Sequence, residues 1–85
     1  MRPVKWQDLR KVCLLLGCRD ARERGDHFLM TRPGLARPVV FKKVKDLRED
    51  IVLGVGRTLG IDRKEIERLL NEVSGKKKET GKKNG

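Results

Sequence analysis

The chain has 85 residues, which supply enough apolar side chains for one compact core and too few for a second. Its 22 Lys and Arg against 12 Asp and Glu give a net charge of +10, a balance that favours nucleic acid or an acidic protein as a partner. The longest apolar run, Val12–Leu16, is too short to span a membrane, and the N-terminal residues lack the apolar stretch of a signal peptide. We therefore expect a cytoplasmic protein that does not bind membranes.

Two cysteines and one histidine are the candidates for soft metal ligands in this sequence. Cys13 and Cys18 are close together along the chain, and Cys13 belongs to an apolar helical run, so we expect both as reduced, packed thiols. Structural zinc needs more ligands at recognised spacings, and His27 is the one further donor. The sequence therefore predicts neither a metal site nor a cofactor.

The first half of the chain predicts a helix followed by a hairpin. Apolar residues recur at helical spacing over Lys5–Leu16, which Gly17 ends, and the apolar face consists of Trp6, Leu9, Cys13 and Leu16. Gly25-Asp26 is a dipeptide that favours turns, and His27–Thr31 behind it has the length and apolar content of a strand. The charged segment Arg19–Arg24 is then expected to pair with it as the other strand of the hairpin.

The second half predicts a third strand and two helices. A turn at Arg32-Pro33-Gly34 leads into Pro38–Phe41, which is rich in β-forming residues. Leu47–Leu59 has an apolar residue every four positions and predicts the second helix, whereas Asp62 marks the N-cap of a third, whose apolar residues are Ile66, Leu69, Leu70 and Val73. We thus expect one α+β domain with the order helix, three-stranded antiparallel sheet, helix, helix.

The second predicted helix contains two glycines, and a basic tail follows the third helix. Gly54 and Gly56 lie inside the second predicted helix, where each costs about 1 kcal/mol relative to Ala, and we expect both to permit close approach to the sheet or to a neighbouring helix. From Gly75 onward the chain has no apolar residue and five lysines. We therefore expect a folded domain over residues 1–74 and a disordered basic tail over 75–85.

A set of spaced motifs resembles the HicA family, small toxins of bacterial and archaeal toxin–antitoxin pairs. The motifs are Gly17, the triplet Gly25-Asp26-His27 on a short apolar strand, and the helix ending Leu59-Gly60-Ile61. The resemblance extends over most of the chain before the tail. It implies a fold similar to double-stranded-RNA-binding domains, cleavage of mRNA without a cofactor, inactivation by a cognate HicB-like antitoxin, and a functional histidine at His27.

Two positions depart from the family pattern. Asp26 stands where the family usually has a serine, and a later histidine that some relatives carry is absent from the region Lys42–Lys45. We interpret Asp26 as a turn former rather than as a carboxylate partner of His27, because adjacent residues of a strand point to opposite faces.

When the 2′-OH of RNA attacks the neighbouring phosphate, a nearby base must accept its proton, and the imidazole of His27 is a suitable base. Imidazole, with an unperturbed pKa of about 6.5, accepts a proton near neutral pH, and Gly25 permits close approach of an RNA backbone. The cations expected to hold phosphate and stabilise the transition state are Arg22, Arg24, Lys42, Lys43 and Lys45. Because the chain has one histidine, a lysine or water would protonate the leaving oxygen.

Three other interpretations stay open from the sequence. One is that His27 is an ordinary hairpin residue, and a second is that the chain is an RNA-binding module of the same fold without catalytic activity. The third is a helix-turn-helix for DNA built from the last two helices. It is disfavoured because the last helix carries carboxylates that would repel phosphate, namely Glu65, Glu67 and Glu72.

Overall fold

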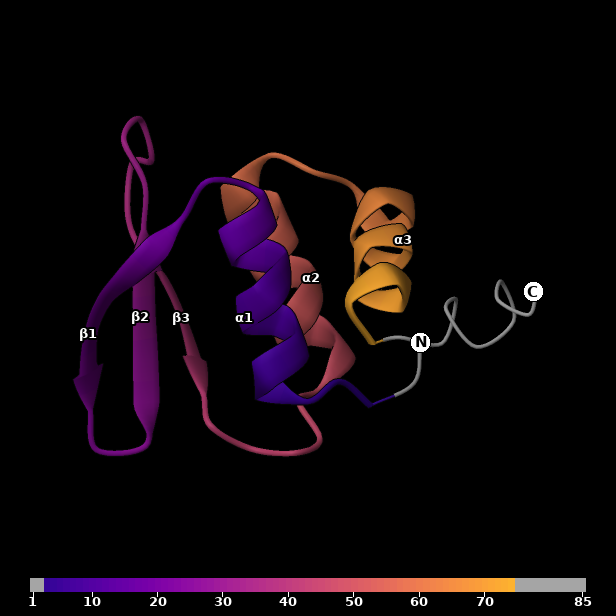
Figure 1. Cartoon of the computed structure of the whole chain (residues 1–85), viewed down its shortest axis with the longest axis horizontal. Helices are drawn as coiled ribbons and strands as arrows, with labels where there is room; N and C mark the ends of the chain where they lie inside the picture. The colour runs from indigo at the N-terminus through magenta and orange to yellow at the C-terminus, as the bar shows by residue number, and fades with distance from the viewer. Residues whose placement is uncertain (1–2, 75–85) are drawn as a thin grey trace.

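The computed structural model describes residues 3–74, so the predicted tail lies outside the described residues. The elements in chain order are α1 (Trp6–Leu15), β1 (Arg19–Arg24), β2 (His27–Thr31), β3 (Val39–Lys42), α2 (Glu49–Leu59) and α3 (Arg63–Ser74) (Figure 1). The strands form one antiparallel sheet in the order β1-β2-β3. The predicted α+β class and the order of its helices and strands are confirmed.

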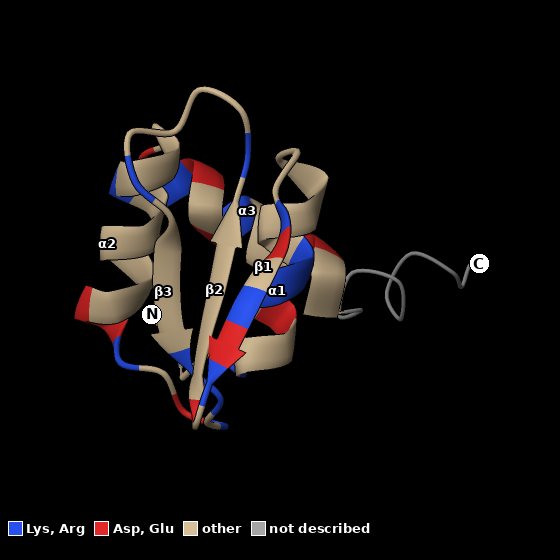
Figure 2. Ribbon diagram, turned by 90° about the vertical axis from the view of Figure 1, so that its left-hand side faces the viewer, with Lys and Arg blue, Asp and Glu red and all other residues tan. Residues whose placement is uncertain are grey.

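The helices cover one side of the sheet. α1 and α2 lie next to the sheet, and α3 packs against both of them, farther from the strands (Figure 1). Figure 2 shows the sheet in front and the helices behind it, so no helix lies over the side of the sheet that faces the viewer. Within residues 3–74, no helix has the length and apolar content needed to cross a membrane.

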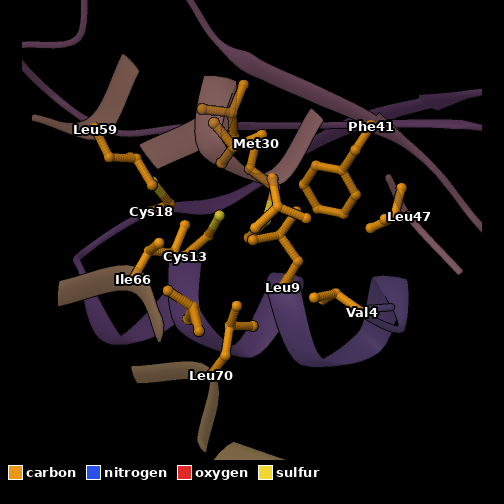
Figure 3. Packing of buried hydrophobic residues seen from close by; sticks show 14 of the residues in the cluster. Val4, Leu9, Cys13, Cys18, Met30, Phe41, Leu47, Leu59, Ile66 and Leu70 are labelled. Atoms are coloured by element: carbon orange, nitrogen blue, oxygen red, sulfur yellow. The ribbon is translucent and has the colours of Figure 1, made fainter. Parts of the chain in front are cut away.

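The hydrophobic core lies between the sheet and the helices (Figure 3). Every layer contributes a fully buried side chain, among them Leu9, Met30, Val52 and Ile66. On β2, Phe28 and Met30 are buried, whereas the alternate residues beginning with His27 are exposed or half-buried. Because successive strand residues point to opposite faces, His27 points to the uncovered side of the sheet.

The first residues of α2 and β3 differ from the predicted ones. α2 begins at Glu49, not at Leu47, because Leu47 pairs with Val4 in an isolated β-bridge, where its N–H donates to the Val4 carbonyl at 2.8 Å. β3 begins at Val39, one residue after Pro38, which has no N–H to contribute to a strand ladder. In both cases backbone pairing, rather than side-chain periodicity, sets the boundary.

The two glycines of α2 have different surroundings. A Cβ added at Gly56 would lie 3.2 Å from Ile66 Cδ1 and 3.5 Å from the Ile61 carbonyl oxygen, so this glycine permits the close approach of α2 and α3, as predicted. A Cβ added at Gly54 would meet nothing within 4 Å. The predicted packing role is therefore wrong for Gly54, which gives up about 1 kcal/mol of helix stability without a packing reason inside the described chain.

The two cysteines behave as packed thiols, as expected. Cys13 and Cys18 are both buried and both free. Burial raises the pKa of Cys13 to about 12 and also raises the pKa of Cys18, so both thiols stay protonated at neutral pH. Protonated, buried thiols are poor nucleophiles and poor metal ligands, and these two therefore serve the core.

Candidate functional site

A tight hairpin turn places His27 at the start of the central strand. Gly25 and Asp26 form the two-residue turn between β1 and β2, and Gly25 has a φ of 58°. A positive φ at the first central position alone is the pattern of a type II′ turn, which joins twisted strands without splaying them. His27 is thus the first residue of the central strand, opposite Arg24 on one side and Lys42 on the other.

Because of an irregularity in β1, the arginines of this strand lie on one side of the sheet and its acidic residues lie on the other. The pairing register shifts between Asp20 and Arg22, so that one extra residue is accommodated there. Cross-strand partners share a face, so each residue of β1 lies on the same side of the sheet as its partner in β2. Arg19, Arg22 and Arg24 pair with residues of β2 that point to the uncovered side and therefore lie on that side together. Asp20 and Glu23 are opposite the buried residues of β2 and lie on the helix side.

Each of the two carboxylates of β1 accepts hydrogen bonds from a cationic side chain on the helix side of the sheet. Asp20 accepts hydrogen bonds of 3.1 and 2.8 Å from the Arg10 guanidinium of α1. Glu23 accepts one of 2.8 Å from Lys43 Nζ, which also lies 5.6 Å from the centre of the Trp6 ring. The negative charges of β1 are therefore neutralised away from His27, and so is the charge of Lys43.

The strand residues on the uncovered side of the sheet include four cations and no Asp or Glu. We call this side the open face and define it by eight residues: Arg19, Arg22, Arg24, His27, Leu29, Thr31, Val40 and Lys42. Its four cations make no ion pair with any residue in 3–74. Since β2 is central, paired side chains on both sides bring positive charge to the two flanks of the imidazole.

Asp26 contacts His27 directly, contrary to the sequence prediction. Asp26 Oδ1 lies 3.0 Å from His27 Nδ1, and 46% of the histidine side chain is exposed. The prediction failed because it applied strand alternation to Asp26, which occupies the turn and is free of that constraint. The contact orients Nδ1 toward the carboxylate and leaves Nε2 available to a ligand.

The predicted phosphate-binding residues do not all gather around the imidazole. Arg22, Arg24 and Lys42 share the open face with His27. Lys43 lies on the helix side with Glu23, and Lys45 is exposed in the loop that follows β3. Sequence reasoning missed Arg19, because its membership of the open face depends on the register shift in β1, for which the sequence carries no clear signal.

A hollow of about 420 Å³ lies beside His27, between β3 and the start of α2. It is lined by His27, Val40, Phe41, Lys42, Val44, Asp46, Leu47, Arg48 and Ile51. Arg48, also missed from the sequence, lines this hollow and pairs with Asp50 at 3.3 Å. Elsewhere in residues 3–74, no three His, Cys, Asp or Glu side chains come together in a way that could hold a metal ion.

In comparisons with family models, curated proteins and solved structures, nothing matches the chain. Functional inference therefore depends on the geometry around His27 and on the charge of the open face.

Proposed function

We propose that this protein is an endoribonuclease in which His27 performs acid–base chemistry on RNA held by the open face. In the cell it would act as an mRNA interferase, the HicA-like toxin of a type II toxin–antitoxin pair. The observation that carries the proposal is the position of His27, opposite Arg24 on one strand and Lys42 on the other, with Asp26 Oδ1 3.0 Å from its Nδ1. The two cations attract the phosphate backbone, and the imidazole between them can exchange a proton with the RNA.

The arrangement supports cleavage by the 2′-OH of the RNA itself. His27 Nε2 would take the proton of the 2′-OH, whose oxygen attacks the adjacent phosphorus while the bond to the 5′ oxygen breaks. Arg24 and Lys42 would stabilise the additional negative charge of the transition state. Lys42 or a water molecule would give a proton to the leaving 5′ oxygen, and the products would be a 2′,3′-cyclic phosphate and a 5′-hydroxyl. Asp26 would keep the imidazole in the orientation that presents Nε2.

The direct test is incubation of the purified chain with RNA in the presence of a metal chelator. We expect cleavage into fragments with 2′,3′-cyclic phosphate ends, identified by mass spectrometry. Binding of RNA without cleavage at equimolar protein would contradict the enzyme and leave the non-catalytic RNA-binding module. Cleavage that stops on chelation would contradict the histidine mechanism.

RNA affinity should depend on the three arginines of β1. Replacing Arg19, Arg22 and Arg24 by Gln should reduce the slope of log affinity against log salt by about 2–3, because each lost phosphate contact removes about 0.7–0.9. Affinity can be measured by fluorescence anisotropy between about 50 and 200 mM salt. The measurement reports how many phosphate contacts the open face makes.

A charge-matched variant controls for the loss of net charge. Lys5, Lys11 and Lys64 are exposed and make no ion pair with residues in 3–74, and none of them lies on the open face. Their replacement by Gln removes the same charge and should leave the slope almost unchanged. Equal slopes for the two triple variants would show that RNA is held by the general field and not by this face.

A further inference from the structure

The outer edge of β3 offers unpaired peptide groups. The Lys43 N–H donates to the Asp26 carbonyl at 2.9 Å, which identifies these two residues as a hydrogen-bonded pair. Since such pairs alternate along an antiparallel ladder, Val40, opposite Leu29, directs its N–H and C=O away from β2. No backbone group outside the sheet in residues 3–74 bonds to Val40, and its side chain is 44% exposed. β3 is therefore an open edge.

Two hollows follow one another along α2. The first, of about 420 Å³, lies beside the β3 edge, between Val40 and Ile51, and reaches His27. The second, of about 440 Å³, lies between α2 and the loop that precedes β3 and is lined by Ala36, Arg37, Gly54, Arg57 and Thr58. The hollows share no lining residue, but Ile51, Gly54 and Thr58 are spaced by three and four residues and so share one face of α2. We call the two hollows together the β3–α2 groove, bounded by Val40, Lys42, Asp46, Arg48, Ile51, Gly54, Arg37 and Arg57.

Gly54 is explained by an occupant of this groove. It weakens α2, and a side chain there would meet nothing within 4 Å. Internal packing therefore gives no reason for a glycine at this position. A glycine in the wall of a groove does allow the backbone of a bound segment to approach the helix closely.

The groove is apolar along its walls and has cations at both ends. Val40 and Ile51 are 44% and 42% exposed along it. At the end near His27, Lys42 makes no ion pair in residues 3–74, Arg48 pairs with Asp50 at 3.3 Å, and Asp46 also lines the hollow. Arg37 and Arg57 line the hollow at the other end. An extended segment with apolar residues in its middle and carboxylates at its ends has the complementary chemistry.

We propose that the β3–α2 groove binds an extended segment of a partner protein, acidic at its ends, which adds to β3 as a fourth strand. Main-chain hydrogen bonds to Val40 provide affinity, and side-chain contacts with Ile51 and the four cations provide specificity. Because His27 lines the same groove, the bound strand also covers the imidazole from that side. This last consequence, inhibition of RNA cleavage, rests on the proposed function, whereas the docking itself does not.

Other occupants fit the groove less well. In an antiparallel pairing of two copies through β3, centred on Val40, Lys42 of one copy would lie opposite Pro38 of the second copy, which has no N–H to donate to the ladder. RNA would place phosphates against apolar walls, and the one aromatic ring that lines the groove, Phe41, is buried and cannot stack on bases. RNA is therefore assigned to the open face and the protein strand to the groove, two surfaces that have His27, Val40 and Lys42 in common.

The test is selection of binders from a displayed library of random decapeptides on the full chain, with counter-selection on Gly54→Leu. Leu at this position fills the open space of the groove and favours the helix, so this variant should melt higher than the wild type while it binds the peptides at least tenfold more weakly. Enriched peptides should alternate apolar residues and end in Asp or Glu. Their binding should slow hydrogen exchange of the Val40 amide.

Two controls separate the possible outcomes. Asn71→Leu adds the same apolar side chain at an exposed position of α3 and should bind the peptides as the wild type does. Peptides that bind Gly54→Leu with full affinity, or a selection that enriches none, would overturn the docking proposal. A tenfold loss of RNA affinity in Gly54→Leu would overturn it in favour of RNA in the groove. Peptide docking in a chain that cleaves no RNA would support the docking and contradict the proposed enzyme alone.

Discussion

Replacement of His27 by Ala should lower the rate of RNA cleavage by about 10²–10⁴-fold, the range over which a positioned acid–base group typically contributes. The melting temperature should change little, because 46% of the side chain is exposed and its ring contacts Asp26, which is itself exposed. RNA affinity should also be nearly unchanged, since the cations of the open face remain. Single-turnover cleavage of a labelled RNA, combined with thermal melting, measures both effects.

A second variant distinguishes proton transfer from simple loss of a side chain. His27→Gln keeps a polar group of similar size that cannot titrate near neutral pH, and it should be as slow as His27→Ala. Gln7→Ala, at an exposed position of α1 outside the open face, provides a control that should cleave at the wild-type rate. Equal cleavage by the wild type and His27→Ala would leave the histidine as an ordinary hairpin residue.

Local sequence signals were sufficient to predict the framework of this site. Gly25-Asp26 predicted the hairpin that places His27 on the central strand, and the structure has that turn. Asp62 predicted the start of α3, where its Oδ1 accepts the Glu65 N–H at 2.9 Å. Turn residues and caps act over three or four positions, so their effects can be read from neighbouring residues alone.

The distribution of charge could not be predicted in the same way. Strict alternation along β1 would place Arg19 and Glu23 on one face and Asp20 with Arg22 on the other. The register shift moves both acids to the helix side, where Asp20 meets Arg10 of α1. A shift of one residue exchanges the faces of a strand, and this one is recognised only from the pairing with β2.

Arg32 is a further residue whose role depends on distant segments. The sequence placed it in a turn, but its side chain joins the ends of two helices. Nη1 donates to the Leu16 carbonyl at 2.6 Å, and Nη2 donates to the Leu59 carbonyl at 3.3 Å. The last carbonyls of a helix have no partner within the helix and carry partial negative charge, so one guanidinium satisfies the C-terminal ends of α1 and α2 together.

Replacement of Arg32 by Ala should therefore lower the free energy of unfolding by about 2–3 kcal/mol, because hydrogen bonds to a charged group contribute about 1.5–3 kcal/mol and the loss leaves part-buried carbonyls unpaired. This is a large share of the total for so small a domain. Arg32→Lys keeps the charge but can reach one carbonyl at a time, so it should recover about half of the loss. Arg37→Ala, in the same loop, removes an exposed side chain and should change stability by less than about 0.5 kcal/mol. Urea unfolding measures all three, and equal midpoints for Arg32→Ala and Arg37→Ala would show that the two helix ends do not depend on this guanidinium.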